Sequence, residues 1–227
     1  EVEPTLITER LKSPHRFTNE TGLRFVLVPE REDDMVDPVA LGSQKFCHRI
    51  HEIGHELEVR LFSYDYPKTT EVSVNEVVLC QIDEKYHRQG SEQVRLEVTT
   101  RGMIIIDLNV TGRPSTEGHE SLAGSLVLLE DDISACLKSC FAFVGAFYQD
   151  RDPYLRYDRM VYNVALSGIG MRKLMAKAPQ GGSYQMGTHG DAPVNVFDTP
   201  RLITRVDLKA PGGEIEAVLN LFRRRLR

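Results

Sequence analysis

Two alternating stretches in the middle of the chain constrain its fold more than any other feature. Residues 93–99 alternate valine or leucine with polar side chains, and residues 103–110 alternate isoleucine or leucine with Asp107 and Asn109. Side chains of a strand point alternately to opposite faces, so each stretch predicts a half-buried strand. The Gly-containing turn at residues 101–102 joins them into an antiparallel hairpin whose polar face we expect to meet water.

The remaining patterns place this hairpin in an α+β fold. A β-rich stretch at residues 72–82 precedes it, which extends the hairpin to an antiparallel meander with one wet face. Further strands are predicted at 24–28, 160–166 and 202–208, and helices at 43–58, from Asp131 to beyond Phe147, and at 214–227. This order lacks the regular alternation of a doubly wound parallel sheet. We therefore predict an antiparallel β-meander packed with amphipathic helices.

A loop rich in glycine, serine, threonine and proline at residues 112–119 indicates a boundary. It divides the chain into two predicted lobes. The first, residues 1–115, is an α+β lobe with the meander, and the second, residues 120–227, is an α+β lobe with a Phe-rich helix. A second long loop, residues 168–199, is typical of functional or disordered segments.

Composition excludes several classes of function. The chain has 227 residues and a net charge of −5 with both signs intermixed, so no overall field draws it to nucleic acid or to an anionic membrane. It contains no apolar run of about 18 residues. The four cysteines show no disulfide spacing, and Cys136 and Cys140 fall on one apolar helix face. These features predict a soluble, cytoplasmic protein with no membrane partner.

One string has the spacing of a metal site. His51-Glu52-Ile53-Gly54-His55 matches H-E-x-x-H, in which two imidazoles one helical turn apart hold zinc and the glutamate accepts a proton from the bound water. The string therefore carries one alternative function, a zinc metallopeptidase with His51 and His55 as ligands and Glu52 as base.

The surroundings of that string favour a structural interpretation. Arg49 and Glu56 place charges beside it, the position of a metzincin third histidine holds a leucine, and the best third carboxylate, Glu76, lies in a β-like run. We expect His51 and His55 to lie on the polar face of an amphipathic helix, with no catalytic residue, no metal ligand and no cofactor. The apolar face of that helix is predicted to contain Phe46, Ile50, Ile53 and Leu57.

Two further patterns could contact phosphate. Ser167-Gly168-Ile169-Gly170 follows a strand, but a third glycine is missing and no Lys-Ser/Thr follows, so a plain turn is favoured. The last helix ends with Arg223, Arg224 and Arg225. Basic side chains at this position also stabilise a helix by interacting with the negative end of its dipole. Nucleotide or nucleic-acid binding is therefore a second alternative function.

One family resemblance covers most of the chain. The segments that carry it are, in order, Leu23 to Pro29, Asp37-Pro38, Leu128 to Ile133, Phe141-Ala142-Phe143 and the strand from Tyr162 to Gly168. This succession resembles the region that follows the nucleic-acid- or nucleotide-binding module in bacterial Schlafen/AlbA-type ATP-binding proteins. The resemblance implies the accessory part of a larger regulator or defence protein, with which a chain beginning at Glu1 agrees. The binding module itself is not visible, so no residue inherits its activity.

The leading hypothesis from the sequence is a non-catalytic role. The meander and the amphipathic helices offer surfaces for partners, and the broad apolar surface of the Phe-rich helix suits contacts on more than one side. We therefore predict a sensing, oligomerisation or protein-interaction domain of a larger cytoplasmic regulator, with a protein partner or a second copy as its ligand.

Overall fold

The computed structural model describes most of the chain. The described residues are 21–56, 59, 61–62, 69–73, 76–83, 91–110, 127–169, 173–175 and 195–226. The predicted boundary loop at 112–119, the predicted core position Leu57 and most of the long loop 168–199 lie outside them.

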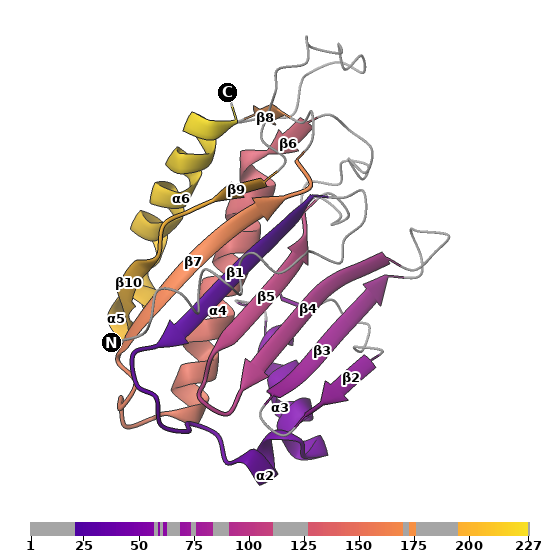
Figure 1. Ribbon diagram of the computed structural model, residues 1–227, viewed down its shortest axis with the longest axis vertical. Helices are drawn as coiled ribbons and strands as arrows, with labels where there is room; N and C mark the ends of the chain where they lie inside the picture. Colours follow the sequence, from indigo (N-terminus) through magenta and orange to yellow (C-terminus); the bar gives the residue numbers. More distant parts are fainter. Residues whose placement is uncertain are drawn as a thin grey trace.

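One antiparallel sheet dominates the structure (Figure 1). Its strand order is β10-β7-β1-β5-β4-β3-β2, and β9 also pairs with β7. The consecutive strands β2 to β5 form the predicted antiparallel meander, which confirms the α+β class. The strands are β1 (Gly22–Pro29), β2 (Thr69–Val72), β3 (Glu76–Asp83), β4 (Ser91–Thr99), β5 (Ile104–Asn109), β7 (Arg159–Ser167), β9 (Asn195–Phe197) and β10 (Arg201–Thr204).

The long helix α4 (Glu130–Arg151) lies across one face of this sheet, behind β1 and β5 in the view of Figure 1. Three acidic residues occupy its first turn, where they suit the positive end of the helix dipole. Its apolar side chains are buried on several sides, as their broad distribution predicted, because it packs on the sheet and also on other helices. Those helices are α3 (Gln44–His55), α5 (Arg205–Lys209) and α6 (Gly212–Arg225).

The predicted hairpin turn between β4 and β5 is confirmed. Gly102 has a φ of +79°, a conformation that glycine adopts at little cost. Its N–H donates to the Thr99 carbonyl at 3.0 Å, and its own carbonyl accepts a 2.8 Å hydrogen bond from the Tyr148 hydroxyl. The turn is therefore fastened to α4.

The polar face predicted for this hairpin is partly exposed on β4, where Arg95, Glu97 and Thr99 are half-buried, but it is buried on β5. Every residue of β5 is buried, including Asp107 and Asn109. Arg24 of β1 lies opposite Asp107 and donates to its carboxylate from Nε at 2.6 Å and from Nη2 at 2.8 Å. A buried carboxylate needs such a partner, and alternation within one strand cannot reveal it, because the partner comes from a strand 83 positions away.

The last predicted strand, residues 202–208, is only half correct. β10 ends at Thr204, and residues 205–209 form the helix α5. The side chain of Thr204 accepts from the N–H of Asp207, and the Asp207 carboxylate accepts from the N–H of Thr204, which is a complete capping box. In this short segment the hydrogen bonds of the capping box stabilise a helix more than the alternating pattern stabilises a strand.

The two predicted lobes share a single sheet in the described part of the chain. β7, from the second predicted lobe, pairs along β1, from the first, over eight residue pairs from Gly22–Ser167 to Pro29–Met160. The sheet therefore does not divide at residues 115–120.

Several smaller features complete the fold. Helix α2 (Pro38–Leu41) leads into α3, and β6 (Val127–Leu129) pairs in parallel with β8 (Lys173–Met175) beside the main sheet. Cys136 and Cys140 are buried, as predicted. Within the described residues, no helix combines the length and apolarity needed to cross a bilayer.

Candidate functional site

Helix α3 carries two histidines whose ring nitrogens face one another. Ser43 begins the helix by accepting a 3.1 Å hydrogen bond from the N–H of Phe46. One turn separates His51 from His55, and their Nε2 atoms lie 2.9 Å apart. One Nε2 therefore donates a hydrogen bond that the other accepts. The structure brings together the two histidines that the sequence singled out.

Phe62 covers this histidine pair. Its ring stacks on His51, with centroids 5.5 Å apart and planes at 17°, and its centroid lies 6.2 Å from that of His55. The ring rests directly on Gly54, where a Cβ atom would fall 2.2 Å from Phe62 Cδ2. The N–H groups of Leu61 and Phe62 both donate to the Gly54 carbonyl. Glycine is required within the string because an aromatic ring occupies the space of its side chain.

Burial lowers the pKa of both imidazoles and so favours their neutral form. Burial, followed by the proximity of His55 and His48, lowers the pKa of His51 to about 4. Burial also lowers the pKa of His55. The sequence placed His51 on a polar helix face, whereas its exposed fraction is 6% because Phe62 folds back over the helix.

Glu52 is engaged elsewhere. Its Oε2 accepts a 3.1 Å hydrogen bond from Nη1 of Arg49, and Nε of the same Arg49 donates to Asp150 near the end of α4. Arg49, whose charge beside the string is unlike a zincin, therefore binds Glu52 and also links α3 to α4. The described residues include no group of three His, Cys, Asp or Glu side chains able to hold a metal ion.

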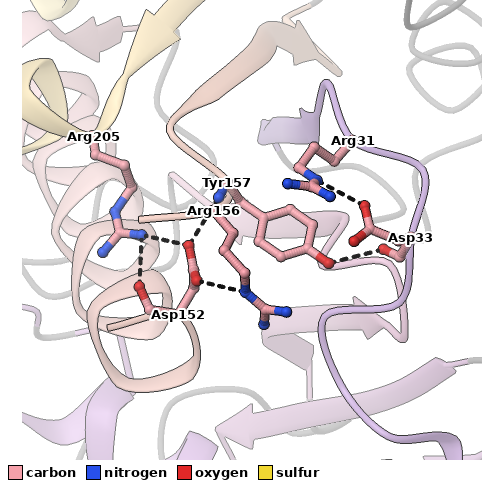
Figure 2. Close-up of polar contacts among 6 residues, drawn as sticks. All are labelled: Arg31, Asp33, Asp152, Arg156, Tyr157 and Arg205. Carbon is pink, nitrogen blue, oxygen red and sulfur yellow. Dashed lines mark hydrogen bonds and ion pairs between the residues drawn. The ribbon is translucent and has the colours of Figure 1, made fainter. Parts of the chain in front are cut away.

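A second polar cluster lies where α4 ends, and Figure 2 shows it. Asp152, with a side chain that is 0% exposed, ends the helix before Pro153. Its Oδ2 accepts from the backbone N–H of Tyr157 at 2.9 Å and from Nη1 of Arg205 at 3.4 Å, and its Oδ1 accepts from Nε of Arg156 at 3.3 Å. One buried carboxylate thereby organises the whole turn from α4 to β7.

Tyr157 stands at the centre of this cluster (Figure 2). Its hydroxyl donates to the Asp33 carbonyl at 3.1 Å, and the guanidinium carbons of Arg31 and Arg156 each lie 5.6 Å from its ring centroid. Arg31 donates to the Asp33 carboxylate, and this contact lowers the pKa of Asp33 and raises that of Arg31. The arginines here are matched by carboxylates, so the cluster is an ion-paired scaffold.

Exposed apolar side chains project beside this scaffold. Tyr154 is 85% exposed and Leu155 is 56% exposed, and both lie in the turn that Asp152 holds. Leu155 has a φ of +56°, a left-handed conformation that costs a leucine about 1–2 kcal/mol. Val206 is 74% exposed and directly follows Arg205. The Asp152–Arg205 ion pair links the two segments that carry these side chains, and we call Tyr154, Leu155 and Val206 the apolar corner.

The apolar corner and its scaffold were not found in the sequence. The only available signal was the polar string Arg151-Asp152-Pro153 after a strong helix, because proline ends helices. Neither the burial of Asp152 nor its distant partner Arg205 leaves a local pattern. The positive φ of Leu155 has none either.

Two of the residues predicted to contact phosphate, Gly168 and Arg223, make contacts within the fold. Gly168 has a φ of +66° and accepts a hydrogen bond from Thr21 through its carbonyl, as in a plain turn, while Gly170 lies outside the described residues. Arg223 donates to Glu130 at the start of α4 from both Nε and Nη2, and also contacts Glu216. That arginine joins α6 to α4.

Comparisons with protein-family models, with curated proteins and with solved structures find no match to this chain. The resemblance to Schlafen/AlbA-type proteins stays a prediction.

Proposed function

We propose that this chain is a non-catalytic protein-interaction domain that pairs with a second copy of itself through the apolar corner. The observation that carries the proposal is the strained backbone of Leu155, an exposed residue directly after the exposed Tyr154. Strain of this kind persists only where the surrounding structure imposes it, and such positions cluster at binding sites. Exposed tyrosines on rigid backbone are also frequent energetic centres of interfaces.

The charges around the apolar corner favour a second copy as the partner. A twofold interface presents the same surface from both subunits, so that surface must complement itself. Here each exposed arginine stands beside a carboxylate: Arg31 beside Asp33, and Arg159 beside Glu30 at 3.3 Å. A surface with paired charges of both signs can meet its own copy without net repulsion.

The edge strand β10 is joined to the turn that bears the apolar corner. β10 stands at one end of the strand order, and its Leu202 is half exposed. The N–H of Arg205, which follows β10, donates to the Asp158 carbonyl, so this edge is fixed to the turn that bears the apolar corner. The sequence resemblance adds the expectation that such a domain serves a larger cytoplasmic regulator or defence protein.

Sedimentation equilibrium over a range of concentrations tests the proposal. We expect a reversible dimer whose Kd rises at least about tenfold in Tyr154→Ser and in Val206→Ser, since each loss of 1.4 kcal/mol is tenfold in affinity. Val39→Ser is the matched control, because Val39 is an equally exposed apolar residue on α2. A wild-type chain that stays monomeric, or a control that weakens the dimer as much, would contradict the proposal.

A further inference from the structure

The histidine pair on α3 has the spacing of two ligands of one metal ion. Metal–nitrogen bonds of about 2.0–2.1 Å that meet at a right angle place the two nitrogens about 2.9 Å apart, whereas a tetrahedral angle separates them by about 3.3–3.4 Å. The Nε2 atoms of His51 and His55 are 2.9 Å apart. Their separation therefore matches adjacent positions of a square-planar or tetragonal ion, which is the geometry of Cu²⁺ and Ni²⁺.

The surroundings hold the two rings in place before any ion binds. Phe62 stacks on His51 and also contacts His55, and its own ring is seated on Gly54. The planes of the two imidazoles are inclined at 69°, with centroids 4.1 Å apart. An arrangement fixed by packing loses little entropy when a ligand binds, so a two-residue site gains affinity from it.

We propose that His51 and His55 form a bidentate site for a divalent transition-metal ion that prefers tetragonal coordination, with Cu²⁺ bound more tightly than Ni²⁺ or Zn²⁺. The ion lies to one side of the line that joins the two Nε2 atoms, and it replaces the hydrogen bond between them. The imidazole that donated that hydrogen bond moves its proton from Nε2 to Nδ1 and so remains neutral. Water completes the coordination on the side of His55, which is the more exposed of the two histidines.

This site differs from the peptidase centre that the sequence string first indicated. It needs neither a third protein ligand nor Glu52, whose carboxylate is held by Arg49. The preference for Cu²⁺ over Zn²⁺ follows the general order of affinity of nitrogen sites for divalent metals. The site shares no residue with the apolar corner, so separate variants test metal binding and self-association.

Electron paramagnetic resonance with Cu²⁺ added to the purified chain tests the proposal. We expect a tetragonal spectrum with hyperfine structure from two nitrogen ligands at about one equivalent of Cu²⁺. His55→Ala should remove one nitrogen and weaken Cu²⁺ binding at least about tenfold. His48→Ala is the matched control, because it removes a histidine of the same helix that does not belong to the pair, and its spectrum and affinity should equal those of the wild type.

The competing outcomes are distinct. Equal losses in His48→Ala and His55→Ala, or no loss in either, would overturn the proposal, as would a Cu²⁺ spectrum without two nitrogen ligands. Circular dichroism of each variant shows that it is folded. His55→Gln, which keeps a polar side chain of similar reach but offers no imidazole, serves if the alanine variant unfolds, and it should lose the ion to the same extent. The dimer Kd, measured in parallel, should be the same in all three histidine variants.

Discussion

Asp152 and Arg205 form an ion pair in the interior, 53 positions apart in the sequence, with 3.4 Å between the carboxylate and Nη1. Their side chains are 0% and 7% exposed. The same Nη1 donates to the Asp152 main-chain carbonyl at 3.3 Å, so Arg205 also satisfies a carbonyl at the end of α4. This pair fixes α5 against the turn that bears the apolar corner.

Replacement of Arg205 by alanine should be strongly destabilising. It leaves Asp152 buried with only its shorter-range partners, and loss of one member of a buried ion pair typically costs about 3–5 kcal/mol. Urea unfolding followed by circular dichroism measures the loss. Arg156→Ala is the control, because Arg156 contacts the same carboxylate from a half-exposed position and should cost about 1 kcal/mol or less. Equal costs would show that burial does not govern the pair.

Gly54→Ala should destabilise the chain by about 1–3 kcal/mol, although alanine is the better helix former. The new methyl group would lie 2.2 Å from Phe62 Cδ2, so the ring must leave its position over the histidines. The free energy of unfolding measures this effect, and a Cu²⁺ titration reports on the displaced ring.

Gly213→Ala supplies the comparison for that variant. Gly213 lies in the first turn of α6, and nothing lies within 4 Å of the position that an alanine methyl group would take there. Its replacement should therefore be neutral or stabilising by up to about 1 kcal/mol. If Gly54→Ala were as well tolerated as Gly213→Ala, the close approach of Phe62 would not be what requires glycine in the histidine string.

The sequence reveals most of this fold because its elements carry local periodicity. The alternation in β4 and β5 and the helical stripe from Ile133 to Phe147 are complete within one segment, and each is confirmed. Two exceptions depend on contacts that alternation does not describe. The end of one predicted strand is a helix because Thr204 and Asp207 form a local capping box. Asp107 is buried because its partner, Arg24, comes from a distant strand.

The candidate sites were less visible for the same reason. The string at His51 and His55 showed the correct spacing, but the ring that buries it comes from Phe62, beyond the end of the helix. The apolar corner depends on a salt bridge to Arg205 and on one unusual backbone angle at Leu155. Periodicity describes which face of an element is apolar, and it contains no information on which segments meet.

Stability should fall in acid through the capping box of α5. Hydrogen bonds from the Thr204 side chain and backbone lower the pKa of Asp207 below its ordinary value of 3.8. The unfolded chain therefore binds the proton first, and the contribution of this carboxylate, complete above the unfolded pKa, is lost as the pH falls through the folded one. NMR titration of the Asp207 carboxyl should give a midpoint below 3.8.

The variant Asp207→Asn provides the control for that titration. Asparagine keeps the shape of the cap without a titrating group, so the stability difference from the wild type should shrink as the pH falls below about 4. A difference that is constant over the acid range would show that the charge of Asp207 does not contribute to the cap.

Two substitutions of Leu155 should affect the stability of the chain differently but weaken its self-association equally. Leu155→Gly relieves the left-handed strain and removes an exposed side chain that contributes little to the core, so it should raise the free energy of unfolding by about 0.5–1 kcal/mol. Leu155→Ala keeps the Cβ atom and hence the strain, and should leave stability nearly unchanged. Both variants remove apolar side-chain surface from the apolar corner and should weaken the dimer to a similar extent, as measured by sedimentation equilibrium.

Two outcomes would contradict these expectations. If Leu155→Gly were no more stable than Leu155→Ala, the positive φ would not be a strained conformation. If neither variant weakened the dimer, Leu155 would not contribute to the interface.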